Sequence, residues 1–334
     1  MRTGKSTRHQ LTADEVIALD AKIRELEDFF GKSQPPEGVT EKEFAPVRGY
    51  ALYVMGRRRM EQAELMDFPA EQLQAARSKW ENELPSLSPE KLESRSREAL
   101  QREARKDSVT LMQRALTYLP DLIAAHTCLA RVYRQANWPR WEDYAERALK
   151  RAAQINPDDP LVNEEYGYFF TSREPADYEK AADYFKKAAE RRPSSRFEWG
   201  KLLARKNDPM EGIDRMWEAI RMYDGTVPPS HFQELVQSTL KAGLALRKAA
   251  ESGTAGGPTL LARAEDSAKA DPAKALLEQA REAQKWLATK EEKLKKDNET
   301  RPSQVGAKLL EDYSRVRQEV TEQIQQVALW PPHA

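Results

Sequence analysis

A pattern of small and large side chains recurs along the middle of the chain and constrains its fold more than any other feature. Four segments share it: 108–120, 145–157, 181–193 and 212–220. In each, a small residue is followed four positions later by a large one and three positions after that by a small one. These steps place the side chains on one helix face, and a proline ends the first three segments. The prolines are 37 and 36 residues apart, a period typical of stacked helical units that bury their apolar faces against one another.

A second pattern comes before each of the last three segments. It consists of a large residue, then a small residue, and a second large residue three positions after the small one. Examples are Tyr166-Gly167 with Phe170 and Trp199-Gly200 with Leu203. Together the two patterns resemble the tetratricopeptide repeat, a helix-turn-helix unit of about 34 residues. The resemblance covers about residues 89–226, in units 89–122, 123–159, 160–195 and 196–226. Two turns are longer than the family spacing, at 137–140 and 174–177.

The resemblance implies which side chains pack the two helices of each unit together. The small residues allow close approach of the helices, and the large ones fill the space beside them. The expected packing residues are Leu129, Ala130, Tyr133, Ala145, Leu149, Ala152, Pro157, Tyr166, Gly167, Phe170, Ala181, Phe185, Ala188, Pro193, Trp199, Gly200, Gly212 and Met216. We therefore expect an all-α fold, a right-handed α-solenoid of helix-turn-helix repeats with flanking helical caps and a C-terminal helical hairpin.

Residues 1–88 form the predicted N-terminal cap region. Capping boxes at 12–15 and 40–43 open two predicted helices. The apolar residues of the first are Val16, Leu19, Ile23, Leu26 and Phe30, and those of the second are Phe44, Val47, Ala51 and Val54. Their spacing of three and four is typical of amphipathic helices, which we expect to cover the open end of the stack.

After the repeats, residues 227–251 are predicted to form a capping helix, and the segment 252–258, rich in glycine and small residues, a flexible linker. Residues 259–334 contain two apolar stripes, 276–294 and 309–327, each about 27 Å long at 1.5 Å per residue. Their equal length favours an intramolecular hairpin, although an intermolecular coiled coil is the alternative.

Composition excludes several classes of function. Lysine plus arginine and aspartate plus glutamate both number 54, so no global field attracts nucleic acid or an anionic membrane. The chain has no apolar run of the roughly 18 residues needed to span a bilayer, and residues 1–9 lack the apolar stretch that is typical of a secretory signal. We therefore expect a cytoplasmic protein without membrane insertion.

The residues that carry catalytic chemistry do not assemble into a recognisable pattern. The four histidines, at positions 9, 126, 231 and 333, lack metal-ligand partners at helical spacing. Gly4-Lys5-Ser6-Thr7 lacks the earlier glycine and the strand of a phosphate-binding loop. His126 and Cys128 are interpreted as packing residues. We expect no enzyme activity, no cofactor and no metal site.

The resemblance also implies a partner-binding surface. In this family, the fifth, ninth, twelfth and thirteenth positions of each first helix face the ligand. Here these positions hold Thr127, Arg131, Arg134, Gln135, Glu164, Tyr168, Thr171, Ser172, Phe197, Lys201, Ala204 and Arg205. The hypothesis is that a concave basic groove formed by Arg131, Arg134, Tyr168, Phe197, Lys201 and Arg205 binds an acidic or C-terminal peptide segment of another protein.

Three alternatives remain open at this point. The basic residues of the predicted groove can simply keep the surface solvated. The terminal helices can build a homo-oligomer that serves as a structural frame. Arg57-Arg58-Arg59 is a short basic run of the kind that binds nucleic acid, but three consecutive residues on a helix point in different directions, so we do not expect nucleic acid as the partner.

Overall fold

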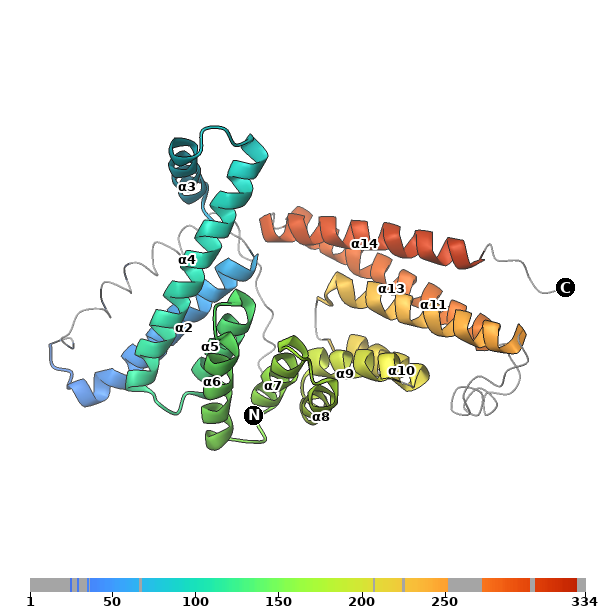
Figure 1. Ribbon diagram of the computed structural model, residues 1–334, viewed down its shortest axis with the longest axis horizontal. Helices are drawn as coiled ribbons and strands as arrows, with labels where there is room; N and C mark the ends of the chain where they lie inside the picture. The colour runs from blue at the N-terminus through green and yellow to red at the C-terminus, as the bar shows by residue number, and fades with distance from the viewer. Residues whose placement is uncertain are drawn as a thin grey trace. The chain divides into compact units, whose positions relative to one another are not determined.

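The computed structural model describes residues 25, 29, 35, 37–65, 68–206, 208–223, 226–251, 272–300 and 304–328 (Figure 1). All regular secondary structure in these ranges is α-helical, and the helices pack in pairs of neighbours. The expected all-α fold of stacked helix pairs is therefore confirmed. The predicted capping box at 12–15, most of the helix that follows it and the predicted linker 252–258 lie outside the described residues.

The helices fall into two compact units. Helices α2 to α7 belong to the N-terminal unit, residues 16–177, and α8 to α14 to the C-terminal unit, residues 178–334. The division falls inside the predicted third repeat, 160–195, so its two helices belong to different units.

The N-terminal unit contains six described helices: α2 (Glu41–Leu65), α3 (Ala70–Glu83), α4 (Pro89–Tyr118), α5 (Ile123–Ala136), α6 (Trp141–Ile155) and α7 (Pro160–Ser172). Their first turns follow from the sequence. The predicted capping box at the start of α2 is present, since Glu43 N donates to Thr40 Oγ1 and Thr40 N donates to Glu43 Oε2. Asp159 caps α7 by accepting from Leu161 N and Val162 N.

The prediction of a helix pair at 89–122 is wrong. Those residues contribute one continuous helix, α4, of 30 residues, and the helix that packs most extensively against it is α2. Ser108 Oγ donates to Gly56 O over 2.8 Å, and a Cβ at Gly56 would lie 3.2 Å from both Met112 Cγ and Ser108 O. The first pair therefore consists of α2 and the C-terminal half of α4. Helix α3 and the other half of α4 are inserted between the two partners.

The buried face of α2 also differs from the prediction. Phe44, Leu52 and Met55 are buried, whereas Val47 and Val54 are exposed. The reason is the pairing with α4. Helix α2 faces α4 with Gly49 and Gly56, and the apolar stripe that includes Val47 faces elsewhere. At Gly49 a Cβ would lie 2.9 Å from the side chains of Tyr118 and Leu119.

The structure buries most of the predicted packing residues. Buried in the N-terminal unit are Leu129, Ala130, Tyr133, Ala145, Leu149, Ala152, Tyr166 and Gly167, and in the C-terminal unit Ala181, Phe185, Ala188, Gly200, Gly212 and Met216. Phe170 and Trp199 are half-buried, and Pro157 is exposed just after the end of α6. Pro193 is the first residue of a helix. The N–H at that position has no partner within the helix, so the N–H that proline lacks costs no hydrogen bond.

The C-terminal unit contains α8 (Tyr178–Ala188), α9 (Pro193–Lys206), α10 (Pro209–Met222), α11 (Pro229–Glu251), α13 (Pro272–Thr300) and α14 (Gln304–Ala328). Helices α9 and α10 approach each other through two glycines. A Cβ at Gly212 would lie 2.6 Å from Gly200 O, and one at Gly200 would lie 2.7 Å from Gly212 O. Any side chain at either position would force the two backbones apart.

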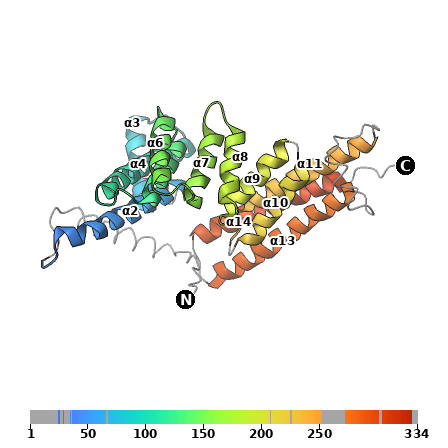
Figure 2. The same ribbon diagram turned by 90° about the horizontal axis from the view of Figure 1, so that it is seen from below.

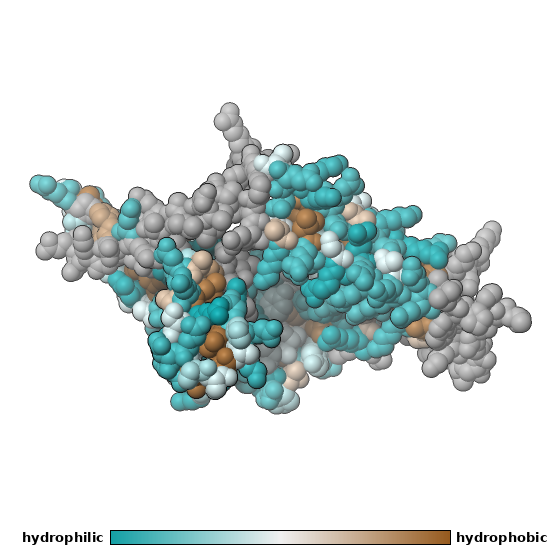
Figure 3. All heavy atoms as spheres, turned by 90° about the horizontal axis from the view of Figure 1, so that it is seen from above, coloured by the Kyte–Doolittle hydropathy of each residue, from teal (hydrophilic) through white to brown (hydrophobic). Residues whose placement is uncertain are grey.

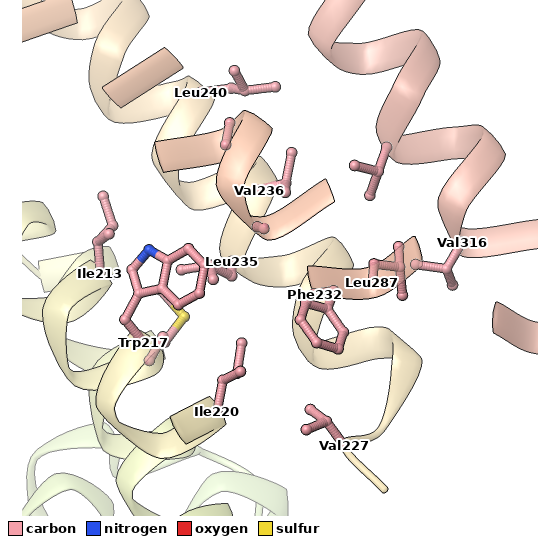
Figure 4. Close-up of a cluster of buried hydrophobic side chains, with 14 of the residues drawn as sticks. Ile213, Trp217, Ile220, Val227, Phe232, Leu235, Val236, Leu240, Leu287 and Val316 are labelled. Carbon is pink, nitrogen blue, oxygen red and sulfur yellow. The ribbon is translucent and has the colours of Figure 1, made fainter. Parts of the chain in front are cut away.

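One apolar cluster holds α9 to α14 together. Figure 4 shows Ile213 and Trp217 of α10, Phe232 and Leu235 of α11, Leu287 of α13 and Val316 of α14 pointing toward one another. Helices α13 and α14 form the predicted hairpin, and both pack against α11 (Figures 1 and 2). Tyr313 OH donates to Val227 O. The hairpin therefore shares the core of the preceding helices and does not form a separate domain.

Candidate functional site

The candidate site lies on α5 and α7 of the N-terminal unit, beside α2. Helix α5 contacts both α2 and α7, so the first helices of successive pairs are neighbours. Two arginines of α5 and two residues of α7 come together here. We call Arg131, Arg134, Glu165 and Tyr168 the arginine cluster.

Glu165 is the centre of this cluster. Its side chain is 1% exposed. Arg131 Nε donates to Glu165 Oε1 over 2.8 Å, Arg131 Nη2 contacts the same oxygen, and Arg134 Nη2 lies 3.5 Å from Oε2. Two guanidinium groups thus share one carboxylate, so these three residues carry one excess positive charge.

Electrostatics keep Arg131 protonated. Burial alone would lower the pKa of Arg131, but the adjacent Glu165 carboxylate outweighs burial and holds that pKa above its usual range. Glu165 Oε2 has no hydrogen-bond partner, because Arg134 stays beyond ideal reach. The Arg134 guanidinium instead lies 5.0 Å from the centroid of the Tyr168 ring, a cation–π contact that fixes its position.

Helix α2 borders the arginine cluster with one hydrogen-bonded carboxylate and one ion pair. Gln135 Nε2 of α5 donates to Glu64 Oε1 of α2 over 2.8 Å, and Arg57 Nε donates to Glu61 Oε1 over 3.0 Å. Arg57 is exposed and is thus available to solvent on this side of α2. Gln135 is uncharged, so Glu64 keeps its negative charge beside the cluster, where it helps the Glu165 carboxylate to raise the pKa of Arg131.

Cys128, on the same helix, is buried and does not act as a nucleophile here. Burial raises the pKa of its thiol to about 11, so the thiol is protonated at neutral pH. His126 Nε2 lies 2.8 Å from Pro120 O, and burial lowers its pKa. Both residues have the packing roles expected from the sequence.

The remaining predicted groove residues lie in the C-terminal unit and do not form a basic surface there. Phe197 is fully buried, with its ring 3.8 Å from the His231 ring and parallel to it; a ligand-facing role for Phe197 is therefore wrong. Lys201 Nζ lies 3.1 Å from a carboxylate oxygen of Glu198 and 2.8 Å from one of Glu234. Arg205 is exposed.

The basic run on α2 is not a continuous patch. Arg57 pairs with Glu61, Arg58 is largely buried with Nη1 3.9 Å from the same carboxylate, and Arg59 Nη1 donates to Gln62 Oε1. Within the described residues, no three histidine, cysteine, aspartate or glutamate side chains are placed to hold a metal ion. None of the described helices is both long and apolar enough to cross a membrane.

Sequence reasoning did not identify Glu165, which neutralises one of the predicted groove arginines. A signal for it exists, since Glu165 follows Arg131 by 34 residues, about one repeat period. Side chains one period apart on first helices are candidates for contact between neighbouring units.

Comparison with solved structures gives remote likenesses. No family model matches the chain, and no curated protein matches it. A solved structure described as a functional characterisation of Pseudomonas aeruginosa PilF is 18% identical and has a TM-score of 0.37 over 63% of this chain and 92% of that chain. This similarity is too low to assign a family or a function.

Proposed function

We propose that the chain is a protein-interaction scaffold whose arginine cluster binds an acidic or C-terminal peptide segment of another protein. The observation that supports this proposal best is the sharing of one buried carboxylate by Arg131 and Arg134. The fold holds both guanidinium groups in place and gives them one shared carboxylate within ion-pair distance.

The chemistry of the side chains suits a carboxylate ligand. A guanidinium has five N–H donors in a planar fork, and Glu165 uses few of those of Arg134. A peptide carboxylate can accept two parallel hydrogen bonds from such a group. The half-buried Tyr168 ring offers apolar area beside it.

One face of the molecule is mainly polar among the described residues. On the face drawn in Figure 3, hydrophilic residues predominate and hydrophobic residues form small, separate patches. Lys201 and Arg205 belong to the earlier hypothesis of a larger groove, but Lys201 already contacts two carboxylates. The proposal therefore rests on the N-terminal unit.

The test is selection from a displayed library of peptides with free C-termini, followed by fluorescence anisotropy with the selected peptides. Arg134→Gln removes the under-used guanidinium and leaves the Arg131–Glu165 pair intact. We expect it to weaken binding by at least roughly tenfold, or about 1.4 kcal/mol. Increasing salt should weaken wild-type binding as well.

Arg151→Gln is the matched control, because Arg151 lies on α6 of the same unit and pairs with Asp121. It should bind the selected peptides as wild type does. Equal binding by wild type and Arg134→Gln, or selection of peptides without acidic residues and without dependence on the free C-terminus, would contradict the proposal.

A further inference from the structure

Helix α2 has an exposed apolar stripe on the side that its pairing with α4 leaves open. Val47 is 54% exposed, Tyr50 is 56% exposed and Val54 is 46% exposed. Steps of three and four place them on one helix face, on which Arg57 and Glu61 follow. Adjacent exposed apolar residues of this kind mark a surface for interaction.

The stripe leads into the arginine cluster. The centroids of the Tyr50 and Tyr53 rings are 5.8 Å apart, and the Tyr53 side chain interacts with Arg57. Two turns further along α2, Glu64 accepts a hydrogen bond from α5, and its carboxylate attracts the Arg131 guanidinium. The exposed residues of α2 and the arginines of α5 therefore belong to one surface of the N-terminal unit.

The two ends of this surface differ in chemistry. The apolar end, residues 47–54, is about 10 Å long at 1.5 Å per residue. At the other end, two guanidinium groups share one buried carboxylate. Glu64 adds a second negative charge there, but it also attracts Arg105 of α4, so positive charge is in excess at this end.

The occupant that fits both ends is an amphipathic helix. Its apolar residues at steps of three and four can pack against the matching row on α2, whereas a strand would turn alternate side chains away. The C-terminus of a helix carries partial negative charge from its free carbonyl groups. A helix whose C-terminus points toward the arginine cluster is therefore favoured over one that points the other way.

We propose that this surface binds an amphipathic helix at the C-terminus of another protein. The apolar face of that helix covers Val47, Tyr50 and Val54, and its acidic C-terminal end lies at Arg131 and Arg134. The inference rests on the proposed function and specifies its ligand. The expected ligand has apolar residues at helical spacing, followed within about two turns by carboxylates.

Two synthetic peptide libraries of equal amino-acid composition test this polarity. Each peptide has about 18 residues, or five helical turns, with varied apolar residues at steps of three and four in a background of alanine and glutamine. In one library, acidic residues follow the apolar positions and the C-terminus is free. In the other, they precede the apolar positions and the C-terminus is amidated.

The readout is retention of peptides on the immobilised full-length protein, identified by mass spectrometry. The wild type should retain the first library at least about tenfold better than the second. Equal retention of the two libraries, or retention of neither, would overturn the inference.

Variants separate the inference from the proposed function. Val47→Gln with Val54→Gln removes apolar area and should weaken binding of the retained peptides roughly tenfold, whereas Tyr144→Gln, at an exposed ring of α6, should bind as wild type does. If the double variant binds normally and Arg134→Gln binds weakly, the proposed function stands and this inference fails. If Arg134→Gln binds normally, both fail.

Sedimentation of the full-length protein tests a second copy of the chain as the occupant. The wild type should sediment as a monomer at all concentrations. A dimer that Val47→Gln with Val54→Gln dissociates would assign the stripe to self-association and overturn the inference.

Discussion

The two units of this protein treat polar side chains differently. Among the described residues, the buried charged side chains, Arg48, Glu164 and Glu165, all lie in the N-terminal unit. The polar side chains that the C-terminal unit buries are Ser195 and Thr239. One apolar cluster extends through its helices from α9 to α14.

The difference indicates a division of roles. Burying charges costs desolvation free energy that their attraction only partly offsets, so charges held in a fold are a poor source of stability. They do fix guanidinium groups in place, as recognition of a carboxylate requires. We therefore expect the C-terminal unit to owe its stability to apolar packing and the N-terminal unit to hold the binding chemistry.

The largest expected effect tests the apolar core of the C-terminal unit. Phe232→Ala removes a fully buried ring and should lower the free energy of unfolding by about 4 kcal/mol. Hydrogen-exchange mass spectrometry should show the loss of protection mainly in α9 to α14. Tyr144→Ala, at an exposed ring of the other unit, should cost less than about 1 kcal/mol. Loss of protection confined to α2 to α7 in Phe232→Ala would refute the assignment.

The next effect concerns pH. Burial, with a smaller effect of Lys201, lowers the pKa of His231 to about 4, below the value of about 6.5 in an unfolded chain. The unfolded state therefore binds the proton first. Stability from this group is complete above about pH 6.5 and is lost as pH falls toward 4, by at most about 3 kcal/mol.

Urea denaturation between pH 7 and pH 4 measures this loss. His231→Phe keeps an aromatic ring against Phe197 and should flatten the pH dependence in the C-terminal unit. His126 changes in the same direction, but its contact with Pro120 O offsets part of the effect of burial, so the N-terminal unit should respond less. An unchanged slope in His231→Phe would show that other groups cause it.

The smallest effect sharpens the role of the arginine cluster. Glu165→Gln keeps the shape of the side chain but leaves Arg131 and Arg134 without their carboxylate, which should cost about 2 kcal/mol of stability. It should also strengthen binding of the selected acidic peptides, because both guanidinium groups become available. Glu93→Gln, which breaks an exposed pair with Arg97, should change neither property. Weaker peptide binding by a folded Glu165→Gln would argue against a direct role for the arginines.

The sequence alone predicted the parts of the fold whose signals are local. The spacing of Ala145, Leu149 and Ala152 placed α6, and two apolar stripes of equal length placed the α13–α14 hairpin. In these segments, the residues that pack together lie on adjacent helices joined by short connections, so that periodicity is sufficient.

The first helix pair and the centre of the candidate site could not be predicted in the same way. Helix α3 is inserted in the sequence between α2 and α4, which pack together. The number of residues between Gly56 and Ser108, which are in contact, therefore depends on the length of that insertion and not on a repeat length. Glu165 carries no local sign of burial, because its position follows from the approach of two helices. The predicted ligand-facing role of Phe197 is wrong for the same reason, because His231 of α11 covers the Phe197 ring.

A substitution of the glycines where α9 and α10 meet cannot be compensated by a second substitution nearby. A methyl group at Gly200 or Gly212 meets carbonyl oxygens and amide nitrogens of the facing main chain, which are the same whatever residue provides them. Shortening a nearby side chain cannot make room. Both positions are therefore expected to remain glycine through rounds of random mutagenesis, while the surrounding large residues exchange with one another.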